Sequence, residues 1–119
     1  MGIRLVRIND RPSTEQAWYF TVPHRVEGIA DHVQQNYITT GLITKNYFST
    51  SPDQLRQVWV TEFADQAAYD QYHADPVIIN YYAHRDAWFS QNSSVTRSVL
   101  PLTSTDEPFD MASTLTATV

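Results

Sequence analysis

The chain has 119 residues, enough for one domain and too few for two, and it contains no cysteine, which excludes disulfides, thiolate zinc sites, iron–sulfur clusters and cysteine nucleophiles. The net charge is -5 and the basic residues are scattered, which argues against nucleic-acid binding. No apolar run approaches the about 20 residues that span a bilayer, and no signal peptide is recognisable, so we expect a cytoplasmic protein with no membrane partner.

The first part of the chain predicts a strand, a loop and a helix. Alternating apolar residues over 3–8 predict a strand that is apolar on both faces. Residues 13–22 fit a capped helical turn or an extended segment equally well, and we treat them as a loop with an aromatic clamp. Apolar residues at helical spacing predict a helix over 26–40 that ends at Gly41. His32 falls on its polar face and is predicted to be solvated.

The rest of the chain predicts a hairpin, two helices, a last strand and a tail. The hairpin is indicated by two apolar segments that flank a Pro-Asp turn. The two helices are indicated by acidic N-cap residues, the second of them followed by proline. In chain order the segments are strands over 42–50 and 55–63, helices over 66–73 and 75–90, a strand over 95–100 and a Ser/Thr-rich tail over 103–119, with a short strand at 113–119 left open.

The order β-α-β-β-α-β predicts an α+β fold of ferredoxin-like topology over residues 1–102, with an antiparallel sheet and helices on one face. The strands are apolar on both faces, because Val58 and Val60 point one way and Trp59 the other. Two helices cover only one face, and soluble monomers rarely expose a large apolar patch. The sequence therefore predicts a homodimer formed through the uncovered face of the sheet.

The sequence carries no recognisable catalytic motif. The four histidines show no spacing typical of metal ligands, and no nucleophile elbow, P-loop or Gly-rich dinucleotide loop is present. We therefore predict neither a metal site nor a cofactor.

The helix predicted over 75–90 contains the most unusual residue. Arg85 falls inside its apolar arc, and an arginine buried without a partner is costly. One interpretation is structural: an internal salt bridge, with Asp31, Glu62 or Asp86 as the partner, or a side chain that extends along the apolar surface to bring its charge to solvent. The other is the floor of a pocket that binds an anionic or carbonyl-bearing ligand.

Tyrosine and tryptophan side chains recur along the predicted elements. They are read first as core, but tyrosines that need hydrogen-bond partners can also form a cavity with polar groups, suited to a planar aromatic ligand. The set comprises Tyr37, Trp59, Tyr69, Tyr72, Tyr81 and Trp88.

Residues 58–63 and 65–77 have a distinctive pattern. A strand ending in an aromatic residue is followed by a short capped helix and by Ala-Asp-Pro, which opens a longer helix. This pattern resembles the dimeric α+β barrel superfamily, which includes the antibiotic-biosynthesis-monooxygenase-like proteins. The resemblance spans roughly residues 3–101 and implies a ferredoxin-like domain that dimerises.

That superfamily includes cofactor-independent monooxygenases of aromatic substrates, haem-degrading enzymes and proteins without known activity. The haem-degrading branch uses an Asn, a Trp and a His. Asn9 matches the first, but Tyr72 stands at the second position and Tyr81 or Tyr82 at the third. The resemblance therefore argues against haem.

Our leading hypothesis is a small-molecule-binding dimer, with monooxygenation of an aromatic substrate as the activity considered. The alternative is a non-enzymatic homodimer, and the sequence leaves open whether the chain is an enzyme. Under the leading hypothesis substrate deprotonation precedes reaction with oxygen. The residues assigned are His84 as the base, Tyr81, Tyr82 and Arg85 as oxyanion-stabilising groups, and Asn36, Trp59, Tyr72 and Trp88 as ligand-binding groups.

Overall fold

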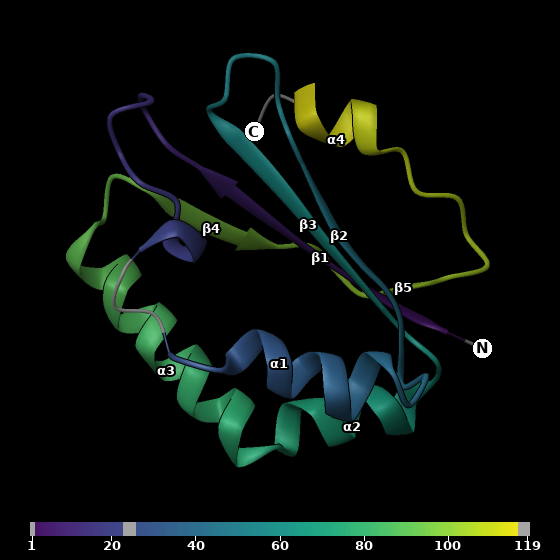
Figure 1. The fold of residues 1–119 in the computed structure, drawn as a ribbon. Helices are drawn as coiled ribbons and strands as arrows, with labels where there is room; N and C mark the ends of the chain where they lie inside the picture. Colours follow the sequence, from purple (N-terminus) through teal and green to yellow (C-terminus); the bar gives the residue numbers. More distant parts are fainter. Residues whose placement is uncertain (1, 23–25, 117–119) are drawn as a thin grey trace.

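The computed structural model describes residues 2–22 and 26–116 and confirms the α+β class (Figure 1). Its strands form one antiparallel sheet in the order β2-β3-β1-β4, with the short β5 paired beside β4 on β1. The predicted strands are confirmed to within a few residues, because alternation along a strand is a local signal. The strands are β1 (Ile3–Asp10), β2 (Ile43–Thr50), β3 (Arg56–Phe63), β4 (Thr96–Val99) and β5 (Thr103–Ser104).

One face of the sheet is covered by helices (Figure 1). Asp65 and Asp75 cap the two later helices, since their Oδ1 atoms accept from the amides of Ala68 at 2.8 Å and Val77 at 2.9 Å. Within the described residues, no helix has the length and apolar character needed to cross a membrane. The helical segments are η1 (Tyr19–Thr21), α1 (Ile29–Val33), the π-helical turn η2 (Gln34–Ile38), α2 (Gln66–Ala74) and α3 (Pro76–Gln91).

The helix predicted over 26–40 is shorter than expected. Gly28 adopts a left-handed conformation with φ of 77° and stands at the N-cap, so the helical run covers only α1 and η2. Gly41, with φ of 80°, follows the run as predicted. His24 lies outside the described residues.

The prediction that His32 is solvated is wrong. Its Nε2 atom lies 2.7 Å from Oδ2 of Asp75, and the Tyr37 hydroxyl donates to the same oxygen at 2.7 Å. Burial alone would raise the pKa of Asp75, but the hydrogen bonds from His32, Tyr37 and the Val77 amide hold it below its ordinary value. This network ties α1 and η2 to the junction of α2 and α3.

The C-terminal segment 100–116 covers the opposite face of the sheet (Figure 1). It includes the helix α4 (Met111–Thr116), so the short strand considered at 113–119 is wrong for residues 113–116, and 117–119 lie outside the described residues. The fully buried Val58 and Val60 pack with Val6 and Ile8 at the centre of this face. The segment contributes Leu100, Phe109, Met111 and Leu115 to that cluster.

Two arginines fasten the C-terminal segment to the sheet. Arg4 pairs with Glu62 at 3.2 Å and donates to the Glu107 carbonyl at 2.8 Å. Arg56 pairs with Asp10 at 2.7 Å and donates to the Thr114 carbonyl at 3.0 Å. The segment expected to be a separate tail is therefore packed on its own sheet.

Candidate functional site

A cavity of about 320 Å³ lies between the helix-facing side of the sheet and the helical layer. This volume is at the lower end of the about 300–1,000 Å³ that is usual for small-molecule sites. The lining side chains of the sheet are Arg7, Asn9, Ile43, Asn46, Trp59, Thr61 and Arg97, and those of the other elements are Tyr19, Phe20, Ile29, Ala30, Val33, Gln34, Ile38, Tyr72, Tyr81, Arg85 and Phe89.

Strand alternation brings the polar residues of the sheet into this cavity. Leu5, in the core under the helices, fixes which face of β1 is inward, and two-residue periodicity places Arg7 and Asn9 on the same face. In the sheet Asn9 lies directly opposite Arg97, and Arg7 lies opposite Trp59. Directly opposed residues place their Cβ atoms about 4.5–5.5 Å apart, so these groups form one continuous wall.

Arg7 is only partly hydrogen-bonded within the protein. Its Nη2 donates to Oγ1 of Thr61 at 2.7 Å, and the Thr61 hydroxyl donates to Oδ1 of Asn46 at 3.0 Å. Nε of Arg7 is buried, as is Oδ1 of Asn9, and neither atom has a hydrogen-bond partner in the part of the chain that the structure describes. A buried donor or acceptor without a partner costs about 1–3 kcal/mol, so both atoms call for an explanation.

Arg85 is buried in α3, as its place in the apolar arc indicated, with only 7% of its surface exposed. Its guanidinium lies 4.0 Å from the ring centre of Tyr82, a cation–π contact. Of the three acidic partners considered for it, Asp86 is the one in contact, at 3.5 Å, and Asp86 also contacts Arg97 at 3.4 Å. Both distances exceed the about 2.7–2.9 Å of a strong charge-assisted hydrogen bond, so the salt-bridge interpretation accounts for Arg85 only weakly.

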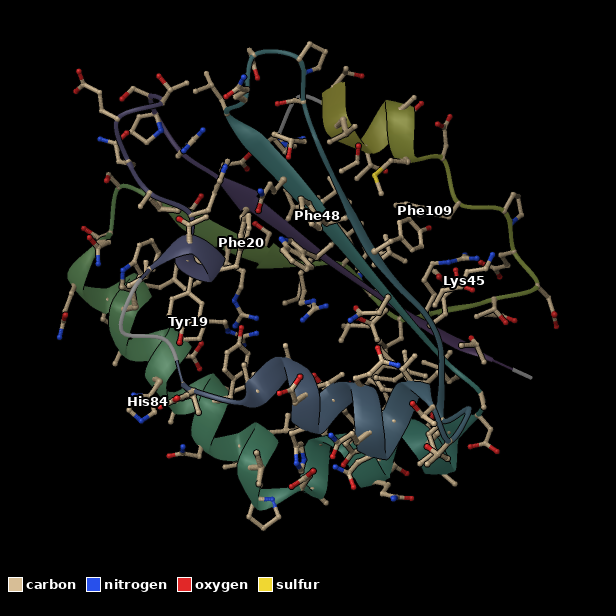
Figure 2. All side chains as sticks on the ribbon, in the orientation of Figure 1. Tyr19, Phe20, Lys45, Phe48, His84 and Phe109 are labelled. Atoms are coloured by element: carbon tan, nitrogen blue, oxygen red, sulfur yellow. The ribbon has the colours of Figure 1, made fainter. Side chains whose placement is uncertain are left out.

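Aromatic rings form the remaining walls. Phe48 stacks on Trp59 with ring centres 4.4 Å apart, and Phe20 meets Trp59 edge-on at 5.6 Å. Figure 2 shows Phe20 directed toward the sheet and Tyr19 directed toward α3, where its ring lies 5.8 Å from that of Tyr81. The loop over 13–22 thus acts as the predicted aromatic clamp by closing one side of the cavity.

The structure brings together some of the predicted site residues. Tyr81, Arg85, Trp59 and Tyr72 line the cavity, and Tyr82 lies against the Arg85 guanidinium. Two of the three predicted oxyanion-stabilising residues and two of the four predicted ligand-binding residues therefore line one cavity, and Tyr82 adjoins it through Arg85.

Three other predicted residues lie elsewhere. His84 is exposed on the outer side of α3 and points away from the sheet (Figure 2). Asn36 is exposed on η2, where its amide donates to the His32 carbonyl at 2.9 Å. Trp88 packs on Tyr19 with ring centres 5.6 Å apart and does not line the cavity. From this position on the outer side of α3, His84 cannot reach a ligand in the cavity.

Arg7, Asn9 and Arg97 were not predicted as site residues. The signal for the first two was available, since the alternation that places Leu5 under the helices continues through Arg7 to Asn9. Arg97 could not be assigned in this way, because its face depends on the pairing of β4 with β1.

The cavity provides cations and phenols rather than a base. Burial, and then the neighbouring Tyr82, raise the pKa of Tyr72 far above its ordinary value, so its phenol stays protonated. Neither a histidine nor a carboxylate is among the described lining residues. In the described part of the chain no group of three or more acidic or histidine residues could hold a metal ion.

Comparisons with protein-family models, with curated proteins and with solved structures find no match for this chain.

Proposed function

We propose that this protein binds one small planar aromatic molecule in the cavity between the sheet and the helices. The observation that carries the proposal is the cavity itself, about 320 Å³ of space walled by aromatic rings and lined by Arg7 and Asn9, each with a buried polar atom that the described chain leaves unpaired. Flat rings stack on side chains such as Trp59 and Phe20, and a few convergent polar groups set their orientation.

The proposal is limited to binding. The monooxygenation considered from the sequence requires a base that removes a proton from the substrate, and His84 was assigned that role. His84 is exposed outside the cavity, and the described lining residues include neither a histidine nor a carboxylate. Tyr81 and Arg85 could still donate hydrogen bonds to a ligand oxygen, which serves binding equally well.

Ferredoxin-like topology is part of the proposal. It is supported by the strand order β2-β3-β1-β4 and by helices that connect β1 to β2 and β3 to β4. The homodimer stays a prediction, and its original argument no longer applies because the C-terminal segment covers the second face. Light scattering that gives twice 13.7 kDa would support the dimer, and 13.7 kDa would contradict it.

Calorimetric titration tests the binding proposal. Two-ring probes, neutral 2-naphthol and anionic 2-naphthoate, are titrated into the wild type, and we expect saturable one-to-one binding of at least one of them. Trp59→Leu removes a stacking wall and should weaken binding about tenfold, since an aromatic pair contributes about 0.5–1.5 kcal/mol beyond buried area. Phe109→Leu is the control for a lost aromatic ring, because Phe109 packs on the opposite face of the sheet and does not line the cavity, and it should change affinity less than about twofold.

No saturable binding of either probe would contradict the proposal. Equal weakening by Trp59→Leu and Phe109→Leu would contradict the assignment of the cavity as the binding site.

A further inference from the structure

The lining of the cavity is positively charged, although the chain as a whole is acidic. The net charge is -5, yet Arg7, Arg85 and Arg97 all line the cavity, and the described lining residues include no acidic side chain. Burial, together with the nearby charges of Arg85 and Arg7, lowers the pKa of Arg97. The guanidiniums of Arg85 and Arg7 therefore both lie within electrostatic range of Arg97, and the folded chain tolerates this repulsion.

Little in the protein compensates these charges. Asp86 contacts Arg85 at 3.5 Å and Arg97 at 3.4 Å, but its side chain is 60% exposed and therefore screened by water. No ion pair of Arg7 is found within the described residues, where its guanidinium donates to the Thr61 hydroxyl. One shared, exposed carboxylate thus stands against three partly or fully buried cations.

Two unpaired atoms lie beside this charge. Nε of Arg7 is a donor and Oδ1 of Asn9 is an acceptor, both buried without a partner in the described chain. Asn9 follows Arg7 by two residues on β1, so both side chains lie on the same face of the sheet. A ligand that satisfies both atoms carries a hydrogen-bond acceptor and a hydrogen-bond donor.

We propose that the cavity selects an aromatic carboxylic acid that also carries a hydroxyl group. The guanidiniums of Arg7, Arg85 and Arg97 hold the carboxylate, the aromatic walls stack on the rings, and Oδ1 of Asn9 accepts a hydrogen bond from the hydroxyl. The planar carboxylate matches the guanidinium fork and can approach closer than Asp86 does. This inference rests on the proposed function and adds the chemical class of the ligand.

Three probes separate the contributions. 2-Naphthol has the hydroxyl without the acid, 2-naphthoate has the acid without the hydroxyl, and 6-hydroxy-2-naphthoate has both at opposite ends. Titration calorimetry at pH 7 should give the tightest binding for 6-hydroxy-2-naphthoate. We expect 2-naphthoate to bind about tenfold more tightly than 2-naphthol, because hydrogen bonds to charged groups contribute about 1.5–3 kcal/mol.

Substitutions assign each contribution to a residue. Arg7→Met should weaken both acids about tenfold and 2-naphthol less than about threefold. Asn9→Leu should remove the advantage of 6-hydroxy-2-naphthoate over 2-naphthoate and leave 2-naphthoate affinity nearly unchanged. Lys45→Met is the control for a lost positive charge, because Lys45 is exposed on β2 and lies outside the cavity (Figure 2), and it should affect no probe.

Each outcome is decisive. Equal affinity for 2-naphthol and 2-naphthoate, unchanged by Arg7→Met, would overturn the acid-selective site while leaving aromatic binding intact. Equal effects of Lys45→Met and Arg7→Met would reduce the preference to net charge and overturn the site. Absence of binding by all three probes would overturn the proposed function as well. Arg97→Met replaces Arg7→Met if the latter does not fold, with the same expectations.

Discussion

The two faces of the sheet use arginine in opposite ways. On the face covered by the C-terminal segment, all three guanidinium nitrogens of Arg4 and all three of Arg56 donate to carboxylates or backbone carbonyls. On the face covered by helices, Nε of Arg7 has no partner among the described residues. Arg85 and Arg97 on that side share one exposed carboxylate.

This difference separates structural arginines from arginines held for a ligand. An arginine whose donors are all used inside the chain contributes to folding, and its removal leaves buried acceptors unpaired. An arginine with an unused buried donor beside a cavity costs stability, and a ligand that supplies the acceptor offsets this cost. Arg4 and Arg7 both lie on β1 but face opposite sides of the sheet, so the same residue type serves two purposes in one strand.

Removal of residues 105–119 tests the tail-covered face most severely. The deletion exposes Val6, Ile8, Val58 and Val60 and removes Phe109, Met111 and Leu115 from the cluster. Each large apolar side chain lost from a core costs about 2–5 kcal/mol, so the total approaches the whole stability of a typical domain, about 5–15 kcal/mol. We expect an unfolded or aggregated product by circular dichroism and light scattering, whereas the composition of the tail alone favours a shift of only a few degrees. A soluble truncated chain with a melting temperature near the wild type would show that the segment is dispensable.

Arg4→Met should have the next largest effect. The Arg4–Glu62 pair is buried, with side chains 6% and 8% exposed, so the substitution leaves a buried carboxylate unpaired. We expect a loss of about 3–5 kcal/mol in the free energy of unfolding measured in urea. The double substitution Arg4→Met with Glu62→Leu removes both charges and should recover most of that loss. A single variant as stable as the wild type would contradict the structural role of Arg4.

Phe109→Ala probes the tail-covered cluster more gently. Phe109 is half-buried against the sheet and lies 5.6 Å from the Arg4 guanidinium (Figure 2). We expect a loss of about 2–3 kcal/mol, below the range for a fully buried Phe. Ile79→Ala on α3 is the control, because Ile79 is 53% exposed, and it should cost about 0.5 kcal/mol. Equal losses for the two variants would mean that Phe109 contributes no more than an exposed residue.

The parts of the fold that the sequence predicts are those with local signals. The strands follow from alternation, and α2 and α3 from the N-cap residues Asp65 and Asp75. The cover of the second face depends on contacts far apart in the chain, such as Arg56 with Thr114, 58 residues away. The expectation that this face is uncovered is wrong for this reason, since a Ser/Thr-rich segment gave no periodic signal of packing, and the homodimer itself stays a prediction.

The candidate site was only partly predicted, because only some of its residues follow from local signals in the sequence. Arg85, Tyr81 and Tyr82 follow from the periodicity of one helix, whereas the outward direction of His84 places it outside the cavity. Which sheet residues face α3 depends on tertiary packing. The alternation of side chains along β1 could have placed Arg7 on the cavity side, but it could not have shown that Nε of Arg7 has no partner in the described chain.

The contrast between the two faces is tested most directly by urea unfolding of Arg7→Met beside the wild type, with and without 6-hydroxy-2-naphthoate. Without the acid, we predict that Arg7→Met is as stable as the wild type within about 0.5 kcal/mol, or more stable, because the substitution removes a buried unpaired donor and a like-charge repulsion. With the acid at about one hundred times its dissociation constant for the wild type, the wild type should gain about 2.7 kcal/mol and the variant, which binds the acid about tenfold more weakly, about 1.4 kcal/mol. A loss of several kcal/mol in the variant without the acid, or an equal gain by both proteins with it, would contradict the account and make Arg7 a structural arginine like Arg4.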